Sequence, residues 1–224
     1  MKAPPPYLGV RFDAEGRALR CSGCTVIGHI RPGPVFDALV AARDALAAAP
    51  GGACFAWLPP SSWHMTLFDG LLHSRRSPGV WPEALPEDAA EADADAWFLE
   101  AVRTAPIAPP PPFALRPTGI AASGGGIGVT LEGATAEEES RLRAFRDALA
   151  AATGLADRPG HASYRFHVTL AYALSHPADH EAFDTALAAT GARLIAAAPR
   201  VAVGPPEICV FDDMTAFRTL ALLA

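Results

Sequence analysis

A proline-rich segment divides the chain almost at its midpoint and limits how the two halves can be connected. Residues 103–117 read RTAPIAPPPPFALRP, with the proline run at 105–112. Proline neither continues a helix nor donates a hydrogen bond inside a sheet, so we expect a stiff extended connector here. We therefore predict a single bilobal domain of 224 residues, with approximate lobes 1–104 and 113–224.

Each half contains one copy of the same short pattern. Residues 62–68 read SWHMTLF and residues 163–172 read SYRFHVTLAY. An aromatic residue, His, an apolar residue, Thr and Leu therefore occur twice in the same order, which packing alone gives no reason to repeat. We expect the two copies to face each other across one cleft.

The rest of the sequence predicts an α+β fold. Apolar runs and turn residues predict strands at 24–30, 53–58, 63–68, 113–122, 126–133, 163–172, 200–211 and 216–224. Helical spacing predicts helices at 34–49, 88–104, 136–152 and 177–189, the third capped by Thr135, and a polar loop is expected at 69–82. A hairpin is expected at the glycine run 124–126. Both halves follow the order strand, helix, strand, strand, which predicts two antiparallel β-sheets flanked by helices.

Strand alternation places both motif histidines on the polar faces of their strands. In the first copy one face carries His64, Thr66 and Phe68, and the other carries Trp63, Met65 and Leu67. In the second copy one face carries Arg165, His167, Thr169 and Ala171, and the other carries Phe166, Val168, Leu170 and Tyr172.

Two histidines and two threonines suit transfer at a phosphodiester. A neutral imidazole can take a proton from the attacking group, and an imidazolium can give one to the departing oxygen. Threonine hydroxyls can donate hydrogen bonds to the non-bridging oxygens. This chemistry requires neither a metal nor another cofactor, and the sequence does not say which histidine is the base.

The motifs His64-Met65-Thr66 and His167-Val168-Thr169 resemble those of the 2H phosphoesterase superfamily, which has one H-x-T/S motif per lobe. The phrases around them, with PEICVFDDMTAF at 206–217, look like a bacterial branch described as a domain of unknown function. This resemblance implies a pseudo-twofold fold with a central cleft. It also implies 2′,3′-cyclic phosphodiesterase, RNA ligase-like or oligonucleotide phosphodiesterase chemistry.

The leading prediction is a metal-independent phosphodiesterase that acts on a cyclic nucleotide phosphate or a short RNA or oligonucleotide end. One alternative is a binding module that holds a nucleotide or an RNA end without turnover. A second is a metal enzyme with His64 and His167 as ligands, which is disfavoured because Thr66 and Thr169, rather than acids, follow them at i+2.

Several neighbours could assist phosphate binding. Arg165 is in phase with His167, and Arg75 and Arg76 follow the first motif, while arginine matches phosphate through its planar fork. Tyr164 could stack on a base if the strand begins irregularly, whereas core packing is expected for Tyr172. A lone C-x-x-C, Cys21 and Cys24, lacks the second pair expected of zinc sites, and Asp212 and Asp213 are expected in a turn.

The charge and hydropathy of the sequence limit the kinds of partner that the protein can bind. A net charge of −6 argues against a general binder of long nucleic acids, which needs a basic face, although a local basic pocket for a nucleotide remains compatible with it. The sequence shows no secretory signal, and prolines break its longest uncharged stretch, 45–68, so we expect a cytoplasmic protein without a membrane partner. The oligomeric state is left open.

Overall fold

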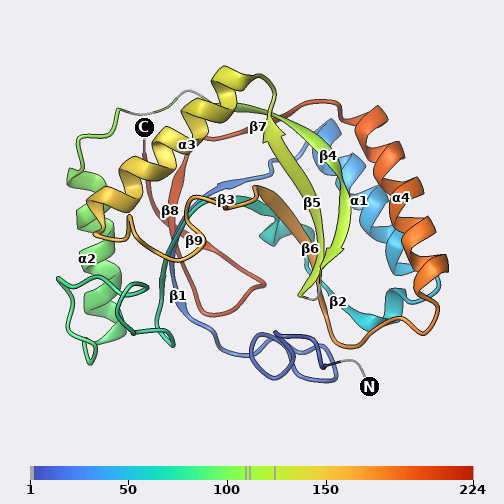
Figure 1. Cartoon of the computed structure of the whole chain (residues 1–224), viewed down its shortest axis with the longest axis horizontal. Helices are drawn as coiled ribbons and strands as arrows, with labels where there is room; N and C mark the ends of the chain where they lie inside the picture. Colours follow the sequence, from blue (N-terminus) through green and yellow to red (C-terminus); the bar gives the residue numbers. More distant parts are fainter. Residues whose placement is uncertain (1–2, 109, 111, 124, 224) are drawn as a thin grey trace.

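The computed structural model describes residues 3–108, 110, 112–123 and 125–223 (Figure 1). Its helices are α1 (Pro34–Ala47), α2 (Glu91–Thr104), α3 (Ala136–Ala152) and α4 (His180–Ala197). Its strands are β1 (Gly23–His29), β2 (Phe55–Trp57), β3 (His64–Leu72), β4 (Phe113–Ser123), β5 (Gly126–Gly133), β6 (His167–Ala173), β7 (Val201–Val203), β8 (Glu207–Phe211) and β9 (Arg218–Leu222). The predicted α+β class is confirmed.

The strands form one curled antiparallel sheet. Its order is β7-β4-β5-β6-β3-β1-β8-β9, and β2 pairs separately with β6. The two sheets expected from the sequence are therefore continuous. They join where β3 meets β6, through the pair Met65 and Val168, which are the central apolar residues of the two motifs.

The halves of the chain exchange strands within this sheet. Strand β2 comes from the first half but pairs with β6, whereas β8 comes from the second half and pairs with β1. The predicted lobes 1–104 and 113–224 therefore do not coincide with the two parts of the sheet. The apolar β8, almost wholly buried, covers an edge of β1 that the first half of the chain leaves unpaired.

Helices cover the outside of the curled sheet. Helix α4 packs on β4 and beside α1, while α3 lies against β3 and β5 (Figure 1). The apolar faces of the motif strands supply the buried core, as alternation predicts, with Trp63, Met65, Phe166 and Val168 at most 1% exposed. None of the described helices is long and apolar enough to cross a membrane.

Several element boundaries differ from the predicted ones. Strand β3 continues to Leu72 where a loop is expected from residue 69, and β6 begins only at His167 rather than at residue 163. Helix α4 begins after Asp179, whose carboxylate caps it, and runs to Ala197 rather than to residue 189. Helix α3 and its Thr135 cap match the prediction, and so does the β4–β5 hairpin, although Gly124 lies outside the described residues.

Candidate active site

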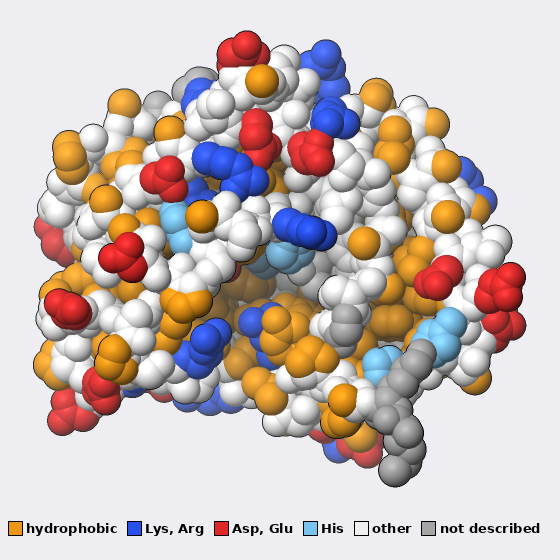
Figure 2. All heavy atoms as spheres, in the orientation of Figure 1, with side chains coloured by type: hydrophobic (Ala, Val, Ile, Leu, Met, Phe, Trp, Pro, Cys, Tyr) orange, Lys and Arg blue, Asp and Glu red, His pale blue; other side chains and the backbone are white. Residues whose placement is uncertain are grey.

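The two motifs converge on one cavity of about 430 Å³. His64 and Thr66 reach it from β3, and His167 and Thr169 reach it from β6. This face of the molecule is hollowed near its centre, with basic and histidine side chains around the hollow (Figure 2). The geometry expected from the duplicated pattern is therefore present.

Both histidines are oriented in the same way. His64 Nδ1 donates to the carbonyl oxygen of Ser62 at 2.7 Å, and His167 Nδ1 donates to that of Arg165 at 2.8 Å. A carbonyl can only accept, so each neutral ring carries its proton on Nδ1. Each Nε2 is thereby left with a lone pair for a ligand.

Matched bulges decide which residues follow the motifs into the cavity. Thr66 and Phe68 of β3 pair with the adjacent β1 residues Ile27 and Val26. Leu67 therefore has no partner on β1 and is the extra residue of a bulge. On β6 the pairing with β5 leaves out Leu170 in the same way. An extra residue reverses the alternation beyond it. Asp69 and Tyr172, each five residues after its motif histidine, consequently line the cavity.

Simple alternation places Tyr172 on the apolar face of its strand and predicts core packing, and the structure departs from this only in part. The residue is 7% exposed and its ring stacks on Phe12, as expected of core packing. Its hydroxyl nevertheless accepts a hydrogen bond from Arg11 Nη1 at 2.6 Å at the cavity wall.

The cavity is locally cationic on an acidic molecule. Among the described lining residues Asp69 is the one acid, whereas the arginines are Arg11, Arg75, Arg146 and Arg158. The whole chain carries a net charge of −6. Charge of one sign concentrated in a cleft favours an anionic ligand.

Most of these guanidinium groups also hold the cavity walls. Arg146 donates to the Leu67 carbonyl at 3.0 Å and to Asp69 at 2.7 Å. Arg158 donates to the carbonyls of Gly70 and Val80 at 2.6 and 2.9 Å. The Arg75 side chain, by contrast, is exposed and has no hydrogen bond or ion pair within the described part of the chain. It is the arginine best placed to meet a ligand.

Two of the predicted phosphate ligands lie elsewhere. Arg76 donates to backbone carbonyls of His73, Glu87 and Ala89 and stacks on Trp81, so it holds the loop after β3. Arg165 lines a separate cavity beside Arg116 and Arg143. Residue 165 precedes the start of β6, and strand alternation therefore does not govern its side chain.

Tyr164 enters the cavity because the chain before β6 is irregular. The Thr66 side chain lies close enough to its hydroxyl to affect the pKa of Tyr164, and the Arg146 guanidinium lies 3.8 Å from the Tyr164 ring centroid. Its ring centroid also lies 6.0 Å from that of His167. Burial raises the pKa of Tyr164 well above its usual range, so the phenol remains protonated.

Burial disfavours a proton on His64. Burial lowers the pKa of His64 to about 4, against the opposing effect of its hydrogen bond to Ser62, and charge on His29 and His167 lowers it further. Phe217 covers His64, with ring centroids 4.1 Å apart. His64 is thus neutral at pH 7.

Sequence reasoning missed the contributions from both ends of the chain. Tyr7 and Arg11 line the cavity from the N-terminal segment, and Phe211 and Phe217 line it from the β8–β9 region. No local pattern marks these residues, because strand pairing and tertiary packing bring them to the site. The charged residues Asp212 and Asp213 lie in the β8–β9 turn as predicted, where Asp213 accepts hydrogen bonds from Thr215.

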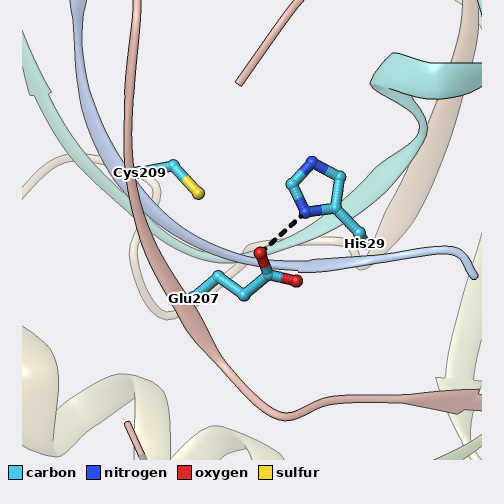
Figure 3. Close-up of side chains that lie close together, drawn as sticks. All are labelled: His29, Glu207 and Cys209. Carbon is cyan, nitrogen blue, oxygen red and sulfur yellow. Dashed lines mark ion pairs between the residues drawn. The ribbon is translucent and has the colours of Figure 1, made fainter. Parts of the chain in front are cut away.

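A cluster of His29, Glu207 and Cys209 adjoins the site (Figure 3). Side chains of these types also occur in metal sites. Here, however, Arg31 donates to one Glu207 oxygen at 2.7 Å, and Thr219 donates to the other at 2.6 Å. Both carboxylate oxygens accept hydrogen bonds, and the cluster is a hydrogen-bonded network. Cys21 and Cys24 are buried free thiols.

Comparison with known proteins places the chain in a family. Residues 11–126, just over half of the chain, match the family described as "2H-phosphodiest: Domain of unknown function (DUF1868)". The chain belongs to this family. The match contains the first motif, with His64, and ends before the second. Membership in the 2H family supports phosphodiesterase-type activity in general.

Solved structures resemble this chain to different degrees. This 2H-family chain is 33% identical to the conserved protein of unknown function ATU0111 from Agrobacterium tumefaciens, over 100% of this chain and 95% of that one, with a TM-score of 0.91. TT0787 of Thermus thermophilus is 18% identical over 89% of this chain and 96% of that one; its TM-score of 0.48 is too low to support an argument. No curated protein matches the sequence.

Proposed function

We propose that the protein is a metal-independent phosphodiesterase that opens a cyclic nucleotide phosphate or cleaves at a short oligonucleotide end. The observation that carries this proposal is the pair of Nε2 atoms of His64 and His167, which line the same cavity and have no hydrogen bond to any described residue. The cavity volume of about 430 Å³ suits a small ligand. Its surplus of arginines suits an anionic one.

The lowered pKa of His64 supports its role as the base in this proposal. Neutral His64 takes a proton from the attacking water, whose oxygen forms a new bond to phosphorus. Protonated His167 gives its proton to the ribose oxygen whose bond to phosphorus breaks. Hydroxyl groups of Thr66 and Thr169 donate to the non-bridging oxygens, and Arg75 neutralises their charge.

Hydrolysis of 2′,3′-cyclic nucleotides by the full chain, in buffer containing EDTA, tests this proposal. We expect a single nucleoside monophosphate product. We also expect kcat/KM to fall by roughly 10²–10⁴-fold in His64→Ala and in His167→Ala. The control is His176→Ala, at an exposed histidine outside the cavity. Unchanged rates in both motif variants would exclude the proposal.

The same assay separates the non-catalytic alternative. A nucleotide- or RNA-end-binding protein would bind these ligands saturably, with Arg75→Ala weakening binding, but would release no product at any pH. Product identified from cyclic nucleotides or from short 2′-5′ and 3′-5′ oligonucleotides eliminates that alternative and identifies the substrate class.

A further inference from the structure

His29 lies directly beside the proposed base. It pairs with His64 across the β1–β3 ladder, so both side chains lie on the same face of the sheet. Their ring centroids are 6.3 Å apart. Neither motif contains His29, and the reaction proposed above leaves it without a role.

Within the described part of the chain, His29 has a carboxylate partner and His64 forms no ion pair. The Nδ1 atom of His29 lies 3.1 Å from Glu207 Oε2, and Figure 3 marks this pair with a dashed line. Glu207 is only 3% exposed. The polar contact of His64 is instead the neutral carbonyl of Ser62, and its ring lies against Phe217. A proton that reaches this pair of imidazoles is therefore held better on His29.

We propose that His29 and His64 share a single proton, which the Glu207 carboxylate retains on His29, so that His64 stays a neutral base. His29 is thus a positioning residue that acts through charge on His64. This inference rests on the proposed function only for its catalytic consequence. The order in which the two rings take up protons is a property of the protein without substrate.

The other charged groups around the pair agree with this order. Burial raises the pKa of Glu207, but hydrogen bonds from Thr219 and His29 outweigh it and hold that pKa below its usual range, so the carboxylate is ionised. Burial raises the pKa of the Cys209 thiol to about 11, so it adds no charge at neutral pH.

Two cationic groups complete the surroundings. Arg31 pairs with the far oxygen of Glu207, at 2.7 Å, and leaves the near oxygen to His29 and Thr219. His167 faces His64 from β6, and its charge, like that of His29, disfavours a proton on His64. A proton on His29 and a second on His64 would repel each other across 6.3 Å.

Histidine NMR titration of the full chain, with ¹³C-labelled imidazoles, tests the inference directly. Resonances of His29 and His64 are assigned from His29→Asn and His64→Gln. In the natural sequence we expect His29 to become protonated first as pH falls, and His64 to remain neutral until well below pH 6. If His64 takes up its proton before His29, the inference is wrong.

The variant His29→Asn provides the second measurement. The Asn amide nitrogen takes the place of Nδ1 and still donates to Glu207, while the charge is removed. We expect the titration midpoint of His64 to rise by about one pH unit. The matched control is His176→Asn, which should leave that midpoint unchanged. A midpoint unmoved in His29→Asn would also overturn the inference.

The proposed phosphodiesterase function and the proposed order of protonation can be disproved independently of each other. If the protein has no phosphodiesterase activity, the titration order still tests the shared proton. If the protein is active, the acid limb of its pH–rate profile should move to higher pH in His29→Asn by the same amount as the His64 midpoint. An acid limb that stays in place while the midpoint moves would mean that His64 is not the base.

Discussion

At the scale of single residues, the site depends on side chains that fix other side chains. Tyr164 is the clearest case, since its hydroxyl adjoins the Thr66 side chain and its ring lies 3.8 Å from the Arg146 guanidinium. It joins the second half of the chain to the first motif. We therefore expect Tyr164 to support Thr66, in addition to any contact with a base.

Replacement of Tyr164 by Phe tests this support. The ring remains, but Thr66 loses the neighbouring hydroxyl, so we expect the loss to fall on transition-state stabilisation. We expect kcat to fall about five-fold, corresponding to roughly 1 kcal/mol, with KM nearly unchanged. Steady-state kinetics on the cyclic nucleotide measures both constants. A rise in KM at constant kcat would assign Tyr164 to ligand binding instead.

The depressed pKa of His64, about 4, also affects stability. In the unfolded chain the same imidazole titrates near about 6.5, so between these values the unfolded state binds more protons. This contribution to the free energy of unfolding is complete above pH 6.5 and is lost as pH falls towards 4. Urea unfolding from pH 7 to 4 should show a smaller decline in His64→Gln than in the natural sequence. Equal declines would contradict the burial of a neutral His64.

At the scale of elements, the bulges of the motif strands complete the site. Gly70 adopts φ 53° on β3, and a Cβ there would lie 2.0 Å from the Cys24 carbonyl oxygen. Only glycine fits this close approach. The irregular strand turns Asp69 towards the cavity, where it meets Arg146.

Comparison of the variants Gly70→Ala and Gly79→Ala measures the cost of placing a Cβ against the Cys24 carbonyl. Gly79 also has a positive φ, 81°, but a Cβ there meets nothing within 4 Å. We expect Gly79→Ala to cost about 1 kcal/mol of unfolding free energy from backbone strain, and Gly70→Ala to cost at least about 2 kcal/mol more, with reduced activity. Urea unfolding measures both. Similar losses in the two variants would show that β3 relaxes easily at the bulge.

Sequence patterns predicted the elements well and the irregularities poorly. Alternation placed His64, Thr66, His167 and Thr169 on the cavity faces because the strand is regular across both H-x-T motifs. It described Tyr172 only in part and missed Asp69, since the extra residues Leu67 and Leu170 carry no mark of a bulge in a single sequence. It also failed for Arg165, because β6 begins two residues later.

At the scale of the whole molecule, long-range pairing decides how the halves combine. The proline segment correctly separates α2 from β4, yet β8 joins β1 and β2 joins β6 across it. Neither exchange could be predicted, because strand partners far apart in sequence carry no local pattern. Arg146 of α3 adds a further link, as its 2% exposed side chain reaches β3 at Leu67 and Asp69.

Removal of the Arg146 link should destabilise the whole domain. Arg146→Ala leaves the Leu67 carbonyl without its side-chain donor and creates a cavity, so we expect a loss of about 2–4 kcal/mol in unfolding free energy. The control, Arg103→Ala, breaks a pair with Glu100 in which both side chains are more than half exposed, and it should cost well under about 1 kcal/mol. Chemical unfolding gives both values, and comparable small losses would mean that α3 is held to β3 by apolar packing alone.

The central claim is that His64 and His167 bind one phosphate between them. A crystal structure of the protein with a nucleoside 2′- or 3′-monophosphate measures this directly. We expect the phosphate in the cavity, with its oxygens about 3 Å from the Nε2 atoms of both His64 and His167. A phosphate that contacts one histidine alone, or that binds outside the cavity, would contradict the account.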